Sequence, residues 1–222
     1  MCGYIAVPWE KVIPADGMNP RDCALIEPMS VGFHAASRAG VTDNDVVMVI
    51  GCGMVGMGAI IRAALRGATV VAVDLDDEKL ALAKEVGATH TINSRTTDVH
   101  EEMIRISQGF GADVVIEAVG NPVTYNMAIN EVSFTGRVVY IGYAKSEVSF
   151  QTKLFVQKEL NICGSRNALP EDFRAVIHYL NTHNFPYDKF ISRIVTPEEA
   201  GEALQTWAAA PQKVFRILAD FR

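Results

Sequence analysis

The chain has 222 residues, of which 49% are hydrophobic, so its length and composition allow one full domain with a sizeable core and part of a second. Its formal net charge is −6 and it has no basic run, which argues against nucleic acid or an anionic membrane surface as a partner. The four cysteines are scattered without a C-x-x-C pair, which argues against a disulfide framework or a zinc ribbon.

The first forty residues predict a short strand followed by two helices. Residues 4–8 have the apolar composition of a strand, and residues 23–40 that of a helix-turn-helix passage. Glu27 lies in apolar surroundings directly before Pro28, so a buried carboxylate there would need a metal, a cation or several donors; an ordinary salt bridge is the plainer alternative. His34 stands alone on an alanine-rich helix and is expected to be a packed core residue.

The stretch 46–74 predicts a dinucleotide-binding βαβ unit. Residues 46–50 are an apolar, β-branched run typical of a buried parallel strand. Gly51, Gly53 and Gly56 follow as G-x-G-x-x-G, which permits a tight turn, a close backbone approach to a pyrophosphate, and close packing of helix on strand. A helix to about Leu65 would point its N-terminal amides at the pyrophosphate, and residues 70–73 form the next strand.

Asp74 ends that second strand, at close to the roughly 20-residue spacing from the glycines at which an acidic residue binds the adenosine ribose. A carboxylate there favours NAD, because it would repel a 2′-phosphate and no arginine follows to receive one. A methyltransferase also pairs a glycine turn with an acid after its second strand. Those two features alone leave that alternative open.

The rest of the chain continues the alternation of strands and helices. It predicts an α/β fold with a doubly wound parallel sheet, whose ligand crevice lies at the carboxyl ends of the strands. Further strands are expected near residue 91 and at 114–117, 137–141 and 160–163, and helices at 77–86, 98–107, 123–132 and 170–182. In the tail, Thr196 is expected to cap a helix that runs to about residue 208, and residues 213–219 read as a closing strand.

With these motifs in view, the chain resembles the medium-chain dehydrogenase/reductase family, in its zinc-type alcohol dehydrogenase branch near sorbitol and L-galactonate dehydrogenases. The motifs that carry the resemblance are ALIEPMSVGFHA at 24–35, GCGMVG at 51–56, AVDLDDEKLALAKEVGA at 72–88, VVIEAVG at 114–120, GRVVYIG at 136–142 and KELNICGSRN at 158–167.

The resemblance implies three parts: residues 1–40 as a piece of a GroES-like barrel catalytic domain, residues 41–182 as the NAD-binding Rossmann domain, and residues 183–222 as the return to the catalytic domain. The family's upstream half, which holds the catalytic zinc ligands and the structural zinc lobe, has no counterpart in this sequence.

The resemblance also assigns site residues. It places Glu27 at the metal, directly or through water, and Val31 against the nicotinamide. The residues at the pyrophosphate would be Gly51, Gly53, Met54, Val55 and Gly56. Asp74 and Lys79 would hold the adenosine ribose. The nicotinamide end would be lined by Val119, Ile141 and Tyr143, with Arg166 as a further cofactor contact. Tyr143 and Asn167 depart from the best-known members.

The function so implied is hydride transfer between a secondary alcohol of a polyol or sugar acid and NAD, with zinc as the Lewis acid. Because a catalytic zinc needs three protein ligands and only Glu27 is evident, the chain by itself is expected to be inactive. The alternatives are a non-catalytic NAD-binding module and a zinc-independent oxidoreductase of the same fold.

The remaining expectations concern assembly and location. As in the family, residues 160–164 should form an edge strand that pairs with a second subunit, in a homodimer or homotetramer. No apolar run reaches the roughly 18 residues of a membrane span, and no signal peptide is evident, so a cytoplasmic location is expected.

Overall fold

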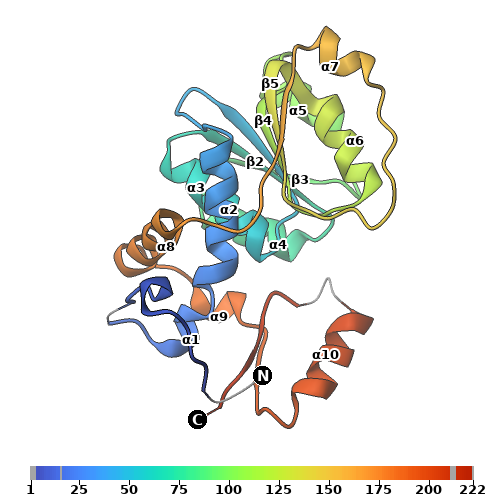
Figure 1. Ribbon diagram of the computed structural model, residues 1–222. Helices are drawn as coiled ribbons and strands as arrows, with labels where there is room; N and C mark the ends of the chain where they lie inside the picture. Colours follow the sequence, from blue (N-terminus) through green and yellow to red (C-terminus); the bar gives the residue numbers. More distant parts are fainter. Residues whose placement is uncertain (1–3, 16, 211–213, 222) are drawn as a thin grey trace.

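The computed structural model describes residues 4–15, 17–210 and 214–221. Its main body is a six-stranded parallel sheet with the order β3-β2-β1-β4-β5-β6 (Figure 1). The strands are β1 (Val46–Ile50), β2 (Thr69–Asp74), β3 (His90–Asn93), β4 (Ala112–Glu117), β5 (Val132–Tyr140) and β6 (Asn161–Gly164). The strand order reverses between β1 and β4, which confirms the predicted doubly wound sheet and puts its ligand crevice between those two strands.

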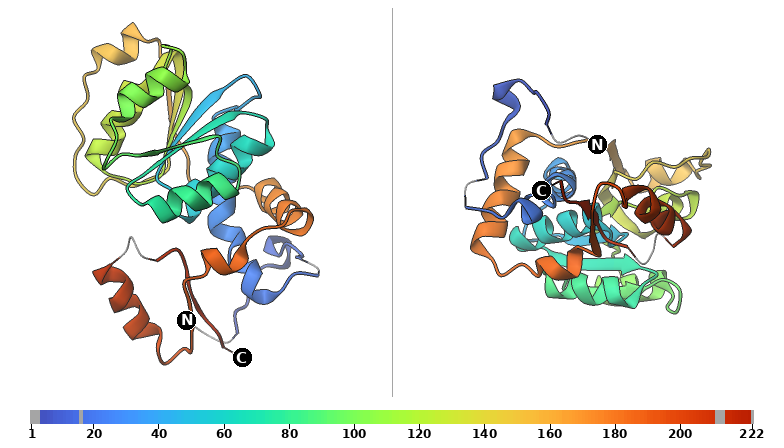
Figure 2. Two further views of the ribbon diagram at one scale, coloured as in Figure 1. Left: turned by 180° about the vertical axis from the view of Figure 1, so that it is seen from behind. Right: turned by 90° about the horizontal axis from the view of Figure 1, so that it is seen from below.

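Helices cover both faces of this sheet, because alternate side chains of each buried strand point to opposite sides. In β1, Val47 and Val49 face one core, while Met48 and Ile50 face the other. The first core is closed by α2 (Ile26–Arg38), α3 (Met54–Leu65), α4 (Asp77–Glu85) and α8 (Pro170–Thr182). The second is closed by α5 (Val99–Ile106) and α6 (Pro122–Glu131), which lie nearest the viewer in the rear view of Figure 2.

The two helices α2 and α3 cross with their backbones in contact. A Cβ atom added to Gly32 would lie 2.1 Å from the carbonyl oxygen of Val55, and one added to Gly58 would lie 2.3 Å from that of Met29. Only residues without side chains allow this approach. The helix that bears Glu27 and Val31 is therefore fixed directly against the helix that follows the glycine turn.

His34 is a packed residue, as predicted. Its Nδ1 lies 2.8 Å from the carboxylate of Asp172 on α8, and both side chains are largely buried. The same carboxylate accepts a hydrogen bond from the amide of Leu169, just before α8 begins. The pair therefore joins α8 to α2.

The lower part of the molecule in Figure 1 is built from segments near both ends of the described chain. It contains η1 (Trp9–Lys11), α1 (Pro20–Cys23), α9 (Tyr187–Phe190), β7 (Arg193–Val195), α10 (Ala200–Ala209) and β8 (Ile217–Ala219). Strands β7 and β8 form a two-stranded parallel sheet. A two-stranded sheet is too little to show whether this part of the chain belongs to a GroES-like barrel. The division of the chain into three parts therefore stays a prediction.

Three expectations at the ends of the chain were wrong in detail. Residues 4–8 are extended but belong to no strand, and Tyr4 and Ile5 are 98% and 81% exposed. Helix α10 begins at Ala200 instead of near Thr196, although the Glu199 carboxylate does accept a hydrogen bond from the Thr196 amide. The closing strand is shorter than expected, and Lys213 lies outside the described residues.

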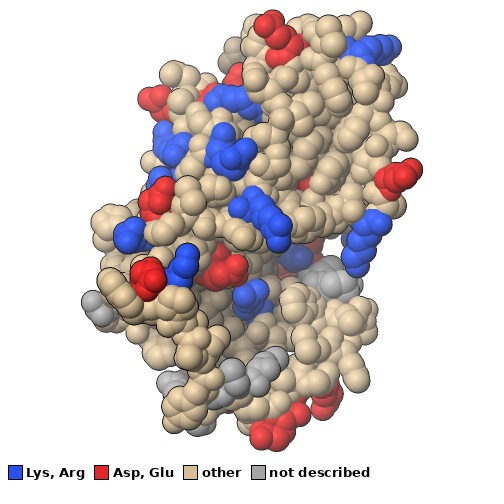
Figure 3. Space-filling model, viewed as in Figure 1, with Lys and Arg blue, Asp and Glu red and all other residues tan. Residues whose placement is uncertain are grey.

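None of the helices in the described part of the chain has the length and apolar character needed to cross a bilayer. Figure 3 shows charged side chains of both signs on the face seen in Figure 1.

Candidate cofactor site

The glycine turn after β1 has the geometry of a pyrophosphate cradle. Gly51 has φ of +95°, a conformation that side chains disfavour, and its amide donates to the carbonyl of Val73. A Cβ atom on Gly56 would lie 1.8 Å from the Gly51 carbonyl oxygen, so only glycine lets α3 start this close to the strand. Apart from Gly53 and its two chain neighbours, no described residue has a heavy atom within 4 Å of a Cβ position on Gly53. That side of the turn has room for a ligand.

The first turn of α3 supplies hydrogen-bond donors to this space. The helix begins at Met54, after Gly53, and no side chain caps it. The first amides of a helix have no partner within it and carry a partial positive charge. The amides at Met54, Val55 and Gly56 therefore fit the oxygens of a pyrophosphate.

Asp74 lies beside this turn at the end of β2. One carboxylate oxygen accepts from the Cys52 amide at 2.7 Å, and the other accepts from the amides of Leu75 and Asp76 at 2.7 and 3.1 Å. The carboxylate is half-buried and acts as an acceptor in all three bonds. It is thus held rigidly next to the cradle, in the place expected of a ribose-binding acid.

Lys79 approaches the same place from α4. Burial raises the pKa of the Cys52 thiol well above its usual value; the Asp74 carboxylate raises that pKa further and the Lys79 ammonium opposes the rise. The charges of Asp74 and Lys79 therefore both act on the glycine turn, which contains Cys52. The Lys79 ammonium also lies 5.6 Å from the ring centre of Phe215, which precedes β8.

The turns after β4 and β5 complete the crevice. The amide of Ala118 donates to the carbonyl of Ile50, and a methyl of Val119 lies 2.6 Å from the Cβ position of Gly51. The side chain of Ile141 is half-buried, and that of Tyr143 is 73% exposed. The structure thus brings the turns that carry Val119, Ile141 and Tyr143 to the edge of the sheet that carries the glycine turn.

Glu117 is the residue at this edge whose role the sequence reasoning missed. Its carboxylate is fully buried and accepts hydrogen bonds from the amides of Val119 and Gly120 and from the hydroxyl of Thr124. An acidic residue that directly follows the apolar run 114–116 was the available signal, because a buried carboxylate requires donors.

Glu27 is not buried, which corrects the expectation for its surroundings. Residues Leu25, Ile26 and Pro28 face the interior, but Glu27 on the first turn of α2 is exposed. It lines a groove of about 560 Å³ together with Cys23 and Phe173. Val31, one helical turn further on, is half-buried.

The described residues do not fit a catalytic zinc by themselves. They bring together no group of three His, Cys, Asp or Glu side chains that could hold a metal ion. Such a site needs three protein ligands. Of the cysteines in this part of the chain, Cys52 is buried, whereas Cys23 and Cys163 are half-buried, and all three are free thiols.

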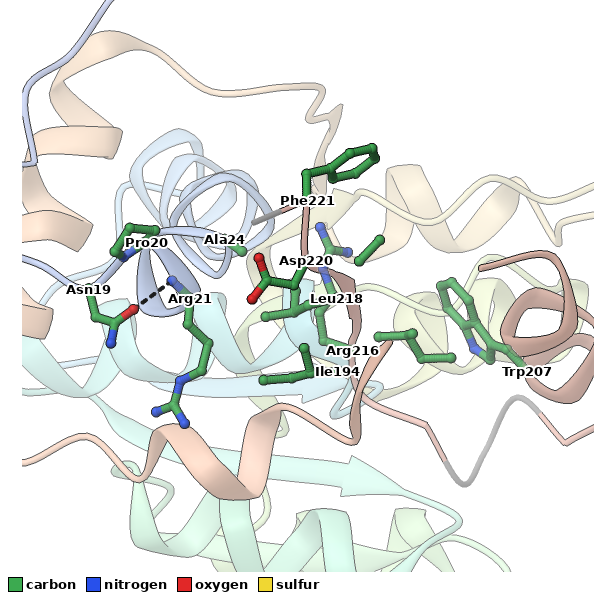
Figure 4. Close-up of a pocket in the computed structure, with 12 residues that line it drawn as sticks. Asn19, Pro20, Arg21, Ala24, Ile194, Trp207, Arg216, Leu218, Asp220 and Phe221 are labelled. Atoms are coloured by element: carbon green, nitrogen blue, oxygen red, sulfur yellow. Dashed lines mark hydrogen bonds between the residues drawn. The ribbon is translucent and has the colours of Figure 1, made fainter. Parts of the chain in front are cut away.

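Arg166 lies two residues after β6, at the same edge of the sheet, and its exposed side chain has no hydrogen bond or ion pair with the described residues. A separate cavity of about 530 Å³ lies among α1, β8 and Trp207 of α10 (Figure 4). It contains none of the predicted site residues.

Known proteins similar to this chain include dehydrogenases and a reductase. A family model described as zinc-binding dehydrogenase matches residues 54–182. The chain is 32% identical to the L-galactonate-5-dehydrogenase of Escherichia coli K12 in an alignment of 194 residues that covers 83% of this chain and 57% of that protein. It is 35% identical to the D-xylulose reductase of Scheffersomyces stipitis over 82% of this chain and 51% of that protein.

A solved alcohol dehydrogenase of Escherichia coli CFT073, complexed with NADH, shares the fold. Its TM-score is 0.84 at 24% identity, over 97% of this chain and 64% of that one. The chain spans between half and two thirds of the length of these three proteins.

Proposed function

The chain belongs to the zinc-binding dehydrogenases, the zinc-type alcohol dehydrogenases of the medium-chain dehydrogenase/reductase family, and from this we propose that it binds NAD in the crevice between β1 and β4. The observation that carries the proposal is the held carboxylate of Asp74 beside an open glycine turn. The likeness to a dehydrogenase solved with NADH is a likeness of fold and agrees with this reading.

Each part of the crevice has a role in this proposal. The amides of Met54, Val55 and Gly56 bind the pyrophosphate, while Asp74 accepts hydrogen bonds from the adenosine ribose, with Lys79 beside it. A preference for NAD over NADP follows, because a 2′-phosphate would be repelled by the Asp74 carboxylate. The nicotinamide half extends toward the turns that bear Val119, Ile141 and Tyr143; Val31 and Arg166 are further contacts of that half.

For the complete family pattern we propose a reversible reaction in which the carbinol carbon of a secondary alcohol would give a hydride to NAD+ and the hydroxyl proton would be released to water, yielding a ketone and NADH. We propose polyols or sugar acids as the substrate class, because the named relatives include enzymes for L-galactonate and D-xylulose. The half-buried to exposed side chains of Ile141 and Tyr143 would meet such a substrate.

For the chain by itself, we propose NAD binding without alcohol oxidation. Glu27 keeps its proposed place at the metal, but the described side chains do not complete a zinc site around it. Among the residues that the structure describes, no lysine, tyrosine or histidine at the crevice stands in an evident general-base arrangement either. This observation favours a non-catalytic NAD-binding module as the second candidate; a zinc-independent oxidoreductase would require turnover without added metal.

The edge position of β6 supports a proposal on assembly. Strand β6 ends the sheet, pairs only with β5 among the described strands, and exposes Ile162. An apolar edge of this kind is an aggregation hazard unless it is covered. We propose that it pairs with β6 of a second copy, in a homodimer or homotetramer. A cytoplasmic location stays a prediction.

Two measurements test the function. Titration of the chain with NADH and NADPH, followed by cofactor fluorescence, should show tighter binding of NADH; equal affinities would contradict the assignment of Asp74. NADH production from a panel of polyols and sugar acids, with and without added zinc, should stay at background. Turnover with zinc would show that the chain assembles a metal site, and turnover without zinc would support the zinc-independent oxidoreductase.

A further inference from the structure

Glu117 is a buried charged group that the proposed cofactor chemistry does not use. It ends β4, pairs in register with Ile50 of β1 and Tyr140 of β5, and has no exposed surface. A charged side chain in such a place is costly unless its hydrogen bonds repay the loss of water. The direction of those bonds therefore indicates what the residue holds in place.

All three side-chain hydrogen bonds of Glu117 converge on one oxygen. Its Oε1 accepts from the amides of Val119 and Gly120 at 3.0 and 2.8 Å, and from the Thr124 hydroxyl at 2.7 Å. The backbone carbonyl of Glu117 accepts from the amides of Ile141 and Gly142 at 2.8 and 3.2 Å. One residue thus binds both turns that face the crevice.

These two turns also touch each other. A Cβ atom on Gly142 would lie 2.2 Å from the amide nitrogen of Gly120 and 2.8 Å from Oε2 of Glu117. The Tyr125 hydroxyl donates to the Gly142 carbonyl at 2.5 Å. The turns after β4 and β5 are therefore held as a unit above the Glu117 carboxylate.

The second carboxylate oxygen shows that packing alone does not account for this residue. Oε2 is buried and has no hydrogen-bond partner in the described chain. Leaving a buried acceptor unpaired costs free energy that an apolar side chain of similar size would not incur. The advantage of Glu117 lies in the charge-assisted bonds that Oε1 makes to the turn.

We propose that Glu117 is a positioning residue, which fixes residues 118–120 and 141–143 against the nicotinamide half of the cofactor. This inference rests on the proposed NAD site. The affinity for ADP should depend on Glu117 much less than the affinity for NADH does. ADP has only the adenosine and pyrophosphate portions, which the glycine turn and Asp74 bind.

The test is Glu117→Gln, with NADH and ADP affinities measured by calorimetry. The side-chain oxygen of glutamine can accept the same three hydrogen bonds as Oε1. The amide nitrogen would take the position of Oε2, which has no partner, so the fold should persist. Loss of the charge weakens the hold on the turn, and the preference for NADH over ADP should fall about fivefold. Loss of the Glu117 charge also relieves repulsion of ADP, which carries more negative charge than NADH, so Thr124→Val, which removes one bond and keeps that charge, is measured beside Glu117→Gln.

Glu131→Gln is the matched control. Glu131 is also buried, but it ends α6 and pairs with His100, and neither residue is at the proposed crevice. This control should leave the NADH-to-ADP preference unchanged. If Glu117→Gln does not fold, Thr124→Val removes one of the three bonds to Oε1 and should lower the preference about twofold.

The outcomes separate the two proposals. Tight NADH binding by the unmodified chain, with the same preference over ADP in Glu117→Gln or in Thr124→Val, overturns the positioning role and leaves the cofactor site intact. A chain that binds neither ligand overturns the proposed function and this inference with it. A fall in preference that Glu131→Gln reproduces would also overturn the inference, because it would reflect general loosening of the fold.

Discussion

Replacing Gly58 by alanine should destabilise the protein although alanine is the better helix former. Gly58 is buried within α3, where its Cβ position lies 2.3 Å from the carbonyl oxygen of Met29 and 3.0 Å from the Met29 Cα. Both are backbone atoms of α2, so no flexible side chain can move aside. The helices would have to separate by about 1 Å to restore normal contact distances.

The size of the effect follows from two opposed terms. Alanine in place of glycine stabilises a helix interior by about 1 kcal/mol. Overpacking of a closely packed core costs about 1 to 3 kcal/mol, and the upper end applies because the whole α2–α3 contact, including fully buried Phe33 and Met29, must open. The net loss should be about 2 kcal/mol, which for a chain of this size lowers the melting temperature by roughly 4–8 °C.

Gly201→Ala provides the matched control. Gly201 also lies in a helix, α10, but apart from its chain neighbours and the backbone of its own helix none of the described atoms comes within 4 Å of its Cβ position. There the helix-propensity term acts alone, and stability should be unchanged or rise by up to about 1 kcal/mol. Urea unfolding followed by circular dichroism compares the two variants. A Gly58→Ala protein as stable as Gly201→Ala would refute the reasoning from backbone contact.

Three further predictions concern the cofactor, assembly and pH. Asp74→Ser should weaken NADH binding about tenfold in fluorescence titration, because charge-assisted bonds are lost, and it should reduce the difference between the NADH and NADPH affinities. An unchanged ratio of NADH affinity to NADPH affinity would exclude Asp74 as the group that discriminates between the two cofactors. Ile162→Lys should convert an oligomer to a monomer in light scattering, and a wild-type chain that is already a soluble monomer at micromolar concentration would count against the β6 pairing. Burial raises the pKa of Tyr140 well above its usual value near 10, so the folded state keeps a proton that the unfolded state loses. The free energy of unfolding, measured with urea at several pH values, should therefore be highest below about pH 10 and decline as the pH rises further. The decline should be smaller in Tyr140→Phe, which has no phenol to ionise.

The βαβ unit could be predicted from the sequence because its determinants are local. An apolar run, three glycines and an acid within thirty residues constrain the backbone wherever they occur. The structure places β1, α3 and β2 where that pattern indicates, and α8 has the predicted bounds.

The ends of the chain were predicted less well for a physical reason. An extended apolar segment becomes a strand only when another strand pairs with it, and residues 4–8 have no such partner among the described strands. Composition also implied that Glu27 is buried. At about 100° per residue, a helix can turn one position outward while its neighbours Ile26 and Pro28 face the core.

By itself, then, the sequence determined the parallel α/β architecture, the glycine turn and the acid beside it, since each depends on short-range pattern. Only the tertiary structure decided which distant turns meet at the crevice. The contact of Gly120 with Gly142 and the bonds from Glu117 to both turns arise because β4 and β5 are neighbours in the sheet. Likewise, the close α2–α3 crossing depends on two glycines far apart in the chain. Such pairings are set by how whole elements pack, which no local pattern encodes.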